Sequence, residues 1–300
     1  MVPDTPTGLR AQALLTPAAA RLARAGAASP AADARTLLAW AAGVDPSRLA
    51  FETIDDAAAR RFERTIAARS AGTPVQHITG VAHFRTLALR VGPGVFLPRP
   101  ETEALTGWAI ERVRALSRDA AGRPRLIVDL GAGSGAIALA IATECPGCRS
   151  YAVERDPMAF DYLRDNVTQF PSDDDRSAPH PVCADMADAL GELDGQVDVV
   201  VSNPPYIPER DRALVSPEVL AHDPPAALFA GADGLDGLRR VAQVAARLLR
   251  PGGWLGVEHD ETTGPASVAH LLDTGDFGEV EDHHDLTGRP RFVTARKLAG

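Results

Sequence analysis

The strongest indication of the fold is the segment Arg125-Leu-Ile-Val-Asp-Leu-Gly-Ala-Gly-Ser-Gly-Ala136. It opens with a short apolar run of the kind found in strands that are buried on both faces. Gly131, Gly133 and Gly135 follow at alternate positions, and an Ala-rich helical segment comes after them. Glycine is needed where a backbone turns tightly and where a ligand approaches it closely. The stretch therefore predicts a strand, a glycine loop that holds a ligand, and a helix.

Strands and helices continue to alternate after this loop. The predicted strands cover residues 149–153, 197–201 and 254–258, and the predicted helices cover residues 136–143, 157–167 and 235–249. Such alternation is typical of a parallel sheet that is covered by helices on both faces. The expected fold class is therefore α/β, with the sheet-forming domain in residues 101–300.

The chain before this domain is expected to be helical. Residues 1–80 are rich in Ala, Leu and Arg, which favour helices. The predicted helices cover residues 11–25, 30–42 and 51–69. Ser29 precedes a proline and is expected to cap the second helix, and Asp55 favours the start of the third. This pattern predicts a small N-terminal helical domain.

A β-hairpin is expected to link the two domains, within residues 81–100. Residues 83–91 alternate between apolar and polar side chains, as strands do. Gly92-Pro-Gly94 is a turn sequence, and residues 95–97 are predicted to form the returning strand.

Composition and charge exclude several classes of protein. Hydrophobic residues make up 45% of the 300 residues, enough for a core, and no run approaches the ~18 apolar residues of a membrane span. Three cysteines, an odd number, argue for a reducing cytoplasm rather than a disulfide framework. No second pair accompanies Cys145-Pro-Gly-Cys148, so we expect no metal site there.

Charge is unevenly distributed along the chain. Residues 1–100 carry 12 arginines and 7 acidic residues, a net charge of +5. Residues 101–300 carry 19 basic and 33 acidic residues, a net charge of −14. This balance argues against a general nucleic-acid binder and suggests that the two parts have different tasks.

Glu154 is the candidate partner of the glycine loop in cofactor binding. It ends the second strand, 23 residues after Gly131. A carboxylate at this place can accept hydrogen bonds from two ribose hydroxyls. Such a group would serve NAD and S-adenosylmethionine equally well, so the residues alone leave both open.

Asn203-Pro-Pro-Tyr206 follows the apolar strand at 197–201, at the sheet edge where ligands bind. Two prolines stiffen the segment, so the side chain of Asn203 and the carbonyl of Pro204 become two fixed acceptors. A planar NH2 group has two hydrogens to offer them, and Tyr206 supplies a face for stacking. An amide or arylamine nitrogen held in this way could attack the methyl group of S-adenosylmethionine, because proximity supplies much of the acceleration.

Together, the glycine loop and Asn203-Pro-Pro-Tyr206 resemble the class I methyltransferases that modify planar nitrogens. Pro98-Arg-Pro-Glu-Thr-Glu103 and Asp285-Leu-Thr-Gly288 are similar to motifs of the HemK-type family, the glutamine-N5 methyltransferases of peptide-chain release factors. The resemblance runs from about residue 70 to 293. It implies a Rossmann-like class I domain, S-adenosylmethionine as cofactor, and the Gln of a release factor's Gly-Gly-Gln loop as target.

The resemblance also implies roles for individual residues. The cofactor-binding residues are Asp129, Gly131, Ala132, Gly133, Ser134, Gly135, Glu154, Asp185, Met186 and Asn203. The catalytic residues are Asn203, Pro204 and Tyr206, and the substrate-binding residues are Asn203, Pro204, Pro205 and Tyr206. The family usually has Asp where this chain has Glu154. It also differs from the family at Glu258-His259-Asp260 and Thr262-Thr263, on the expected substrate-side wall.

The main hypothesis is therefore methylation of release-factor glutamine by a cytoplasmic, monomeric enzyme whose residues 1–80 dock the protein substrate. A DNA adenine-N6 methyltransferase is the alternative enzyme, because an exocyclic amine presents the same planar NH2. It would need a basic groove for base flipping, which the −14 balance does not favour. A non-catalytic nucleotide-binding module is a third hypothesis, and it leaves the Asn203 pocket without a purpose.

Overall fold

A computed structural model describes residues 9–116, 123–170 and 178–299. The chain divides into two compact units. One comprises the chain up to Val81 together with Pro217–His222, and the other comprises the remaining residues. Within the described ranges, no helix is both long enough and apolar enough to span a bilayer.

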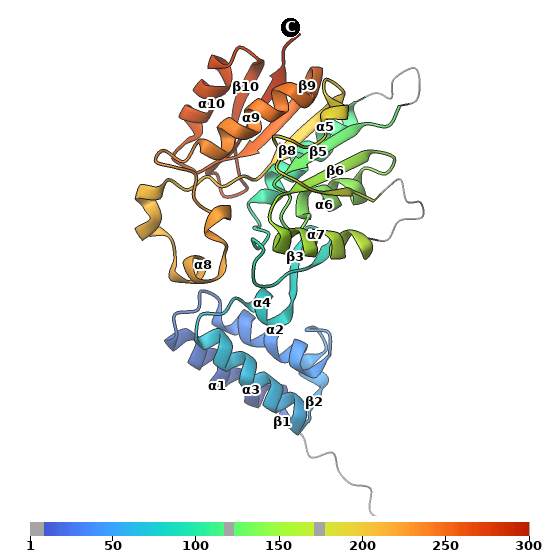
Figure 1. Cartoon of the computed structure of the whole chain (residues 1–300). Helices are drawn as coiled ribbons and strands as arrows, with labels where there is room; N and C mark the ends of the chain where they lie inside the picture. The colour runs from blue at the N-terminus through green and yellow to red at the C-terminus, as the bar shows by residue number, and fades with distance from the viewer. Residues whose placement is uncertain (1–8, 117–122, 171–177, 300) are drawn as a thin grey trace, which may run out of the picture. The chain divides into compact units, whose positions relative to one another are not determined.

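The first unit is a helical bundle with a short two-stranded sheet (Figure 1). Its helices are α1 (Ala11–Arg24), α2 (Pro30–Ala42), α3 (Asp56–Ser70), α4 (Val75–Thr79) and α8 (Pro217–His222), and its strands are β1 (Leu9–Arg10) and β2 (Thr53–Ile54). Leu22, Leu37, Leu38, Phe62 and Ile66 are buried together between the three long helices. The predicted amphipathic stripes therefore form one core.

Of three local predictions in this unit, one is confirmed, one was wrong, and one holds in position but not in its hydrogen bond. The side chain of Asp55 accepts a hydrogen bond from the backbone N–H of Ala58 at 2.7 Å, as a helix cap does. The third helix starts only there and not at residue 51, because Thr53–Ile54 is extended and pairs with β1. Ser29 precedes α2 but makes no capping hydrogen bond through its side chain.

The second unit contains a seven-stranded sheet in the order β10-β11-β9-β8-β5-β6-β7. The strands are β5 (Leu126–Leu130), β6 (Arg149–Glu154), β7 (His180–Cys183), β8 (Val197–Ser202), β9 (Leu249–Glu258), β10 (Phe277–His284) and β11 (Pro290–Lys297). Within this sheet, β11 lies antiparallel to both β10 and β9, and the other neighbouring strands are parallel to each other. The expected α/β fold with a parallel-dominated sheet is confirmed.

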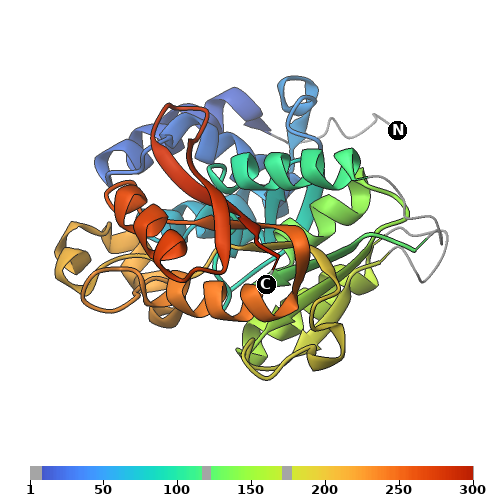
Figure 2. The ribbon, with the colours of Figure 1, turned by 90° about the horizontal axis from the view of Figure 1, so that it is seen from above.

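Helices cover both faces of this sheet, as Figure 2 shows for the blue-green α5 and the orange α9. One face carries α5 (Thr102–Ala115), α6 (Ala136–Glu144) and α7 (Pro157–Thr168). The other face carries α9 (Asp236–Leu248) and α10 (Gly264–Asp273). Ile127 and Val199 face the first layer, whereas Val128 and Val200 face the second. This alternation explains why the central strands are apolar throughout.

The hairpin lies elsewhere than its sequence indicates. Its strands are β3 (Val81–Phe84) and β4 (Leu87–Arg90), so the expected turn at residues 92–94 and the returning strand at 95–97 were wrong. The chain turns at Arg85, which has a left-handed backbone with φ of 52°. Arg85 keeps this conformation because its N–H donates to Glu103 at 2.9 Å and its guanidinium pairs with Glu144. Such tertiary contacts replace the glycine that a turn usually needs.

Candidate active site

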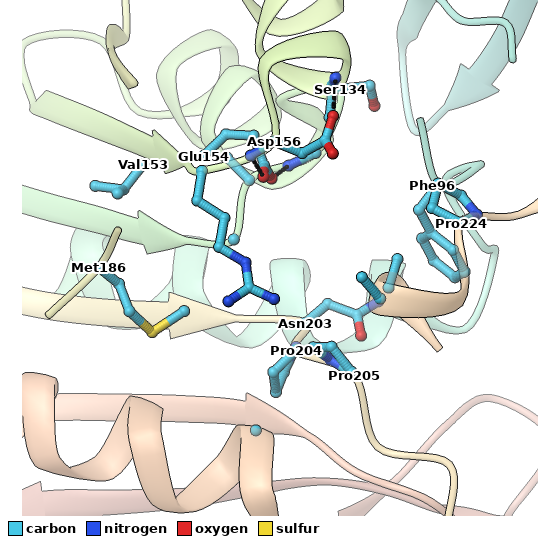
Figure 3. A pocket seen from close by; sticks show the side chains of 18 of the residues that line it. Phe96, Ser134, Val153, Glu154, Asp156, Met186, Asn203, Pro204, Pro205 and Pro224 are labelled. Atoms are coloured by element: carbon cyan, nitrogen blue, oxygen red, sulfur yellow. Dashed lines mark hydrogen bonds between the residues drawn. The ribbon is translucent and has the colours of Figure 1, made fainter. Parts of the chain in front are cut away.

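A cavity of about 610 Å³ opens at the carboxyl ends of β5, β6 and β8, where open α/β sheets bind their ligands (Figure 3). Its lining includes Phe96, Thr102, residues 131–134, Glu154, Arg155, Asp156, Asp185, Met186, residues 203–205, Pro224, Phe229 and Arg240. Met186 lies toward one end of the cavity, and Phe96 and Pro224 lie together at the other, beside residues 203–205.

The glycine loop leaves room for a ligand beside its backbone. The N–H groups of Gly131 and Ala132 both donate to the carbonyl of Val153, which anchors the loop to β6. Gly133 has φ of +55°, and no atom lies within 4 Å of the place that a Cβ would take. Gly135 differs, since a Cβ there would lie 2.7 Å from Cδ1 of Leu163. Gly133 thus borders open space, while Gly135 permits the close packing of α6 against α7.

A buried asparagine holds the loop on the side away from the cavity, and no pattern in the sequence pointed to this residue. Asn166 on α7 donates from Nδ2 to the carbonyls of Ser134 and Arg90 at 2.9 and 3.0 Å. Its Oδ1 accepts the N–H of Arg90 at 2.7 Å. The loop is therefore fixed to the hairpin strand β4 through one side chain.

Glu154 lies at the end of β6 and lines the cavity (Figure 3). One carboxylate oxygen accepts the N–H of Gly133 at 2.9 Å, and the other accepts the N–H of Asp156 at 2.8 Å. Each oxygen keeps a further lone pair for a ligand. The carboxylate therefore fixes the loop and can still accept hydrogen bonds from ligand hydroxyls.

Asp129 lies outside the cavity lining and is 1% exposed. One oxygen accepts the N–H of Ala138 at 3.2 Å, and the other has no partner among the described atoms. Burial raises the pKa of Asp129 to about 7, and the nearby Glu154 carboxylate adds to the shift. A buried acceptor without a partner is costly and marks a place where a ligand or water can supply a donor.

Asp185 and Met186 line the end of the cavity that follows β7. Asp185 accepts the N–H of Ala187 at 3.0 Å and pairs with Arg240 on α9. These two interactions lower the pKa of Asp185, with the backbone N–H contributing most. Arg240 also lines the cavity, and sequence analysis missed it because one arginine on an amphipathic helix is usually only a solvated residue.

Asn203 and its neighbours form the opposite wall. Ser202 donates to the carbonyl of Leu130 at 2.6 Å, which joins the ends of β8 and β5. The Nδ2 of Asn203 donates to the hydroxyl of Thr102 at 3.0 Å, and that hydroxyl donates to Glu258 at 2.8 Å. Sequence analysis missed the part of Thr102 and Glu258 in this chain of hydrogen bonds. Pro204 and Pro205 line the cavity beside Asn203.

Tyr206 is not among the residues that line the cavity. Burial raises the pKa of its phenol, and the neighbouring Glu258 carboxylate raises it further. The aromatic rings on the lining are those of Phe84, Phe96 and Phe229. Phe96 also packs beneath the guanidinium of Arg99 at 4.8 Å, and Arg99 pairs with Asp223.

The departures at Glu258-His259-Asp260 fall on buried contacts outside the lining. His259 is 1% exposed, and its ring nitrogens contact the Asp260 carbonyl at 2.8 Å and the Asp282 carboxylate at 3.0 Å. Thr262 donates to Asp260 at 2.6 Å. These side chains hold the segment between β9 and α10, outside the described cavity lining.

Comparisons with known proteins agree with this geometry. A family profile described as "PrmC N-terminal domain" matches residues 13–80, and one described as "Methyltransferase small domain" matches residues 113–264. The release factor glutamine methyltransferase of Mycolicibacterium smegmatis is 47% identical over 97% of this chain and 99% of its own length. That of Streptomyces coelicolor is 48% identical over 92% and 94%. The N-terminal domain of human METTL16 in complex with SAH shares the fold, with a TM-score of 0.51 and 17% identity over 80% of this chain and 84% of that chain.

Proposed function

We propose a specific reaction for this chain, which belongs to the family of release factor glutamine methyltransferases and is therefore an enzyme. It methylates the side-chain amide nitrogen of the glutamine in the Gly-Gly-Gln loop of peptide-chain release factors. The methyl donor is S-adenosylmethionine. The observation that carries the proposal is the fixed amide of Asn203 in the same cavity as the glycine loop. Membership of this family favours release-factor glutamine over DNA adenine as the target. It also argues against the hypothesis of a non-catalytic nucleotide-binding module, because the family members are enzymes.

The residues present fit S-adenosylmethionine. The cavity volume lies in the range of small-molecule sites, about 300–1,000 Å³. Gly133 leaves open space, Glu154 offers acceptors to the ribose, and Asp129 has an unpartnered oxygen beneath the loop. Asp185 and Met186 would contact the adenine. The cofactor would supply an electrophilic methyl group on a sulfonium.

Asn203 and Pro204 would hold the substrate nitrogen. The Oδ1 of Asn203 and the carbonyl of Pro204 accept the two hydrogens of the glutamine NH2, which orients the nitrogen lone pair toward the methyl group. This positioning supplies much of the acceleration that a weak nucleophile needs. A bound cofactor would supply the methyl group and keep the sulfur as a thioether, and the nitrogen that Asn203 and Pro204 hold would release its proton to solvent. Pro205 and Tyr206 are proposed as further substrate-side residues, Tyr206 by stacking.

We place the enzyme in the cytoplasm, as a monomer, with the first unit docking the release factor. The positions of Arg60 and Arg64 support the docking role. Both side chains are exposed on one face of α3, and neither forms an ion pair with another described residue. Exposed arginines would attract an acidic protein surface over about a Debye length.

Methyl transfer from labelled S-adenosylmethionine tests the proposed function. Purified enzyme is given a release factor, the same factor with the loop Gln replaced by Glu, or adenine-containing DNA. We expect label on the first substrate only, at the loop glutamine by mass spectrometry. Label on DNA, or on the factor without the glutamine, would contradict the assignment.

A further inference from the structure

Three side chains from separate elements form one hydrogen-bond relay that runs from the cavity wall into the protein interior. Asn203 follows β8, Thr102 begins α5, and Glu258 ends β9. Thr102 and Glu258 are 4% and 1% exposed, so water does not replace either partner. The two hydrogen bonds measure 3.0 Å from Asn203 to Thr102 and 2.8 Å from Thr102 to Glu258.

The hydrogens available to this relay determine its direction. An ionised carboxylate can only accept, and a threonine hydroxyl has one hydrogen to donate. Once Thr102 donates to Glu258, it can only accept from Asn203. Asn203 must therefore turn its NH2 toward Thr102, and its oxygen is left for the cavity. The orientation of an asparagine amide is always assigned from such a network.

We propose that Thr102 and Glu258 are positioning residues that make Asn203 present its oxygen, and not its NH2, to the substrate amide. The proposal rests on the proposed function, because only a substrate that brings two N–H donors requires an acceptor at this place. With the amide reversed, NH2 would face NH2 and the substrate nitrogen would lose one of its two acceptors.

A proton on Glu258 would reverse the relay. Protonated Glu258 can donate to Thr102, which then has a hydrogen for the Oδ1 of Asn203. The groups that face Glu258 are Arg291 on β11, Tyr206 after β8 and Glu101 before α5. Burial raises the pKa of Glu258 to about 7, although Arg291 opposes the shift. Asn203 therefore presents its oxygen to the cavity at pH values above about 7, and this orientation is lost as the pH falls below that value.

The kinetic test uses three variants and a control. Thr102→Val removes the hydroxyl at constant shape, and we expect kcat to fall about 10- to 100-fold with little change in KM. Thr102→Ser should restore kcat to within about threefold of wild type. In Glu258→Gln, kcat should lose the decline below pH 7 that wild type shows, because glutamine does not titrate. Thr106→Val is the matched control, since Thr106 is buried one turn further along α5 and donates only to the Thr102 carbonyl.

A second measurement does not depend on activity. The side-chain NH2 of Asn203 can be observed by ¹⁵N NMR and assigned by its absence in Asn203→Asp. We expect slow hydrogen exchange in wild type and Thr106→Val, and fast exchange in Thr102→Val. If wild type methylates no release factor, the proposed function fails while this measurement still tests the relay. A wild-type kcat and unchanged exchange in Thr102→Val would overturn the relay alone.

Discussion

Among the single residues, Glu154 combines a structural role with the proposed cofactor-binding role. Its carboxylate joins Gly133 to Asp156 and also faces the cavity. Glu154→Ala should weaken S-adenosylmethionine binding tenfold or more, because each charge-assisted hydrogen bond is worth about 1.5–3 kcal/mol. Calorimetry measures the affinity, and Glu154→Asp is the control that keeps the charge. Wild-type affinity in Glu154→Ala would contradict the cofactor role.

Asn203 allows a sharper test, since its effect should appear in turnover. Asn203→Ala removes one positioned acceptor while most peptide contacts survive, so kcat should fall on the order of 10²-fold with KM nearly unchanged. Asn203→Asp keeps an oxygen and should retain more activity than the Ala variant. Single-turnover assays on a release factor measure both variants. A wild-type rate in Asn203→Ala would refute the mechanism.

Tyr206 and Phe96 can be distinguished in the same assay. If the ring of Tyr206 stacks on the substrate amide, Tyr206→Phe should be mild and Tyr206→Ala severe. If the hydroxyl beside Glu258 matters instead, both variants should be equally impaired. Phe96→Ala is the comparison, because the ring of Phe96 lines the cavity. A mild Tyr206→Ala beside a severe Phe96→Ala would assign stacking to Phe96.

Among the structural elements, the glycine loop contains two glycines with different expected roles, one in ligand binding and one in packing. Gly133→Val adds a side chain in open space, so we expect it to block the cofactor with a small loss of stability from the positive φ. Gly135→Val places a Cβ 2.7 Å from Leu163 and should lower the unfolding free energy by about 1–3 kcal/mol through overpacking. Calorimetric binding and thermal unfolding measure the two effects. A Gly133 variant that binds normally, or a Gly135 variant as stable as wild type, would show that this division is wrong.

Elements with strong local signals could be predicted from the sequence, and those held by distant contacts could not. Residues 125–136 contain an apolar run typical of a buried strand and glycines that mark where the strand ends. The bounds of β5, the loop and α6 were therefore predicted almost to the residue. The turn at Arg85 depends on Glu103 and Glu144 and has no turn residue. The last two strands were missed because β10 pairs with β11 through register shifts that obscure the alternation. Within the site, the motif residues could be named, but Asn166, Arg240 and Thr102 act through partners far along the chain.

At the scale of the whole molecule, Arg69 joins segments that no local pattern connects. It is 8% exposed and pairs with Asp33 at 2.8 Å and with Glu218, 149 residues later, at 2.7 Å. Glu218 lies in Pro217–His222, the segment that belongs to the first unit together with the chain up to Val81. Arg69→Ala leaves two carboxylates without their cation and should lower the unfolding free energy by about 3–5 kcal/mol. Urea denaturation measures the loss, and the exposed Arg64→Ala is the control, for which we expect less than about 0.5 kcal/mol. Equal stability of the two variants would contradict a structural role for this cluster.

The charge of the first unit bears on how a protein substrate would dock. Residues 1–80 carry nine arginines and seven acidic residues, a net charge of only +2. The other three arginines of the first hundred residues, Arg85, Arg90 and Arg99, belong to the second unit and account for the rest of the +5. Docking should therefore depend on where exposed arginines lie more than on net charge. We expect Arg60→Glu with Arg64→Glu to raise KM for a whole release factor severalfold, to leave cofactor affinity unchanged, and to lose effect at high salt. Arg164→Glu, tested beside each single variant, is the control with the same change in charge, because Arg164 is also exposed, on α7, and pairs with Asp161. If the control raises KM as much as each single variant, the effect is one of overall charge, and the first unit has no docking role through α3.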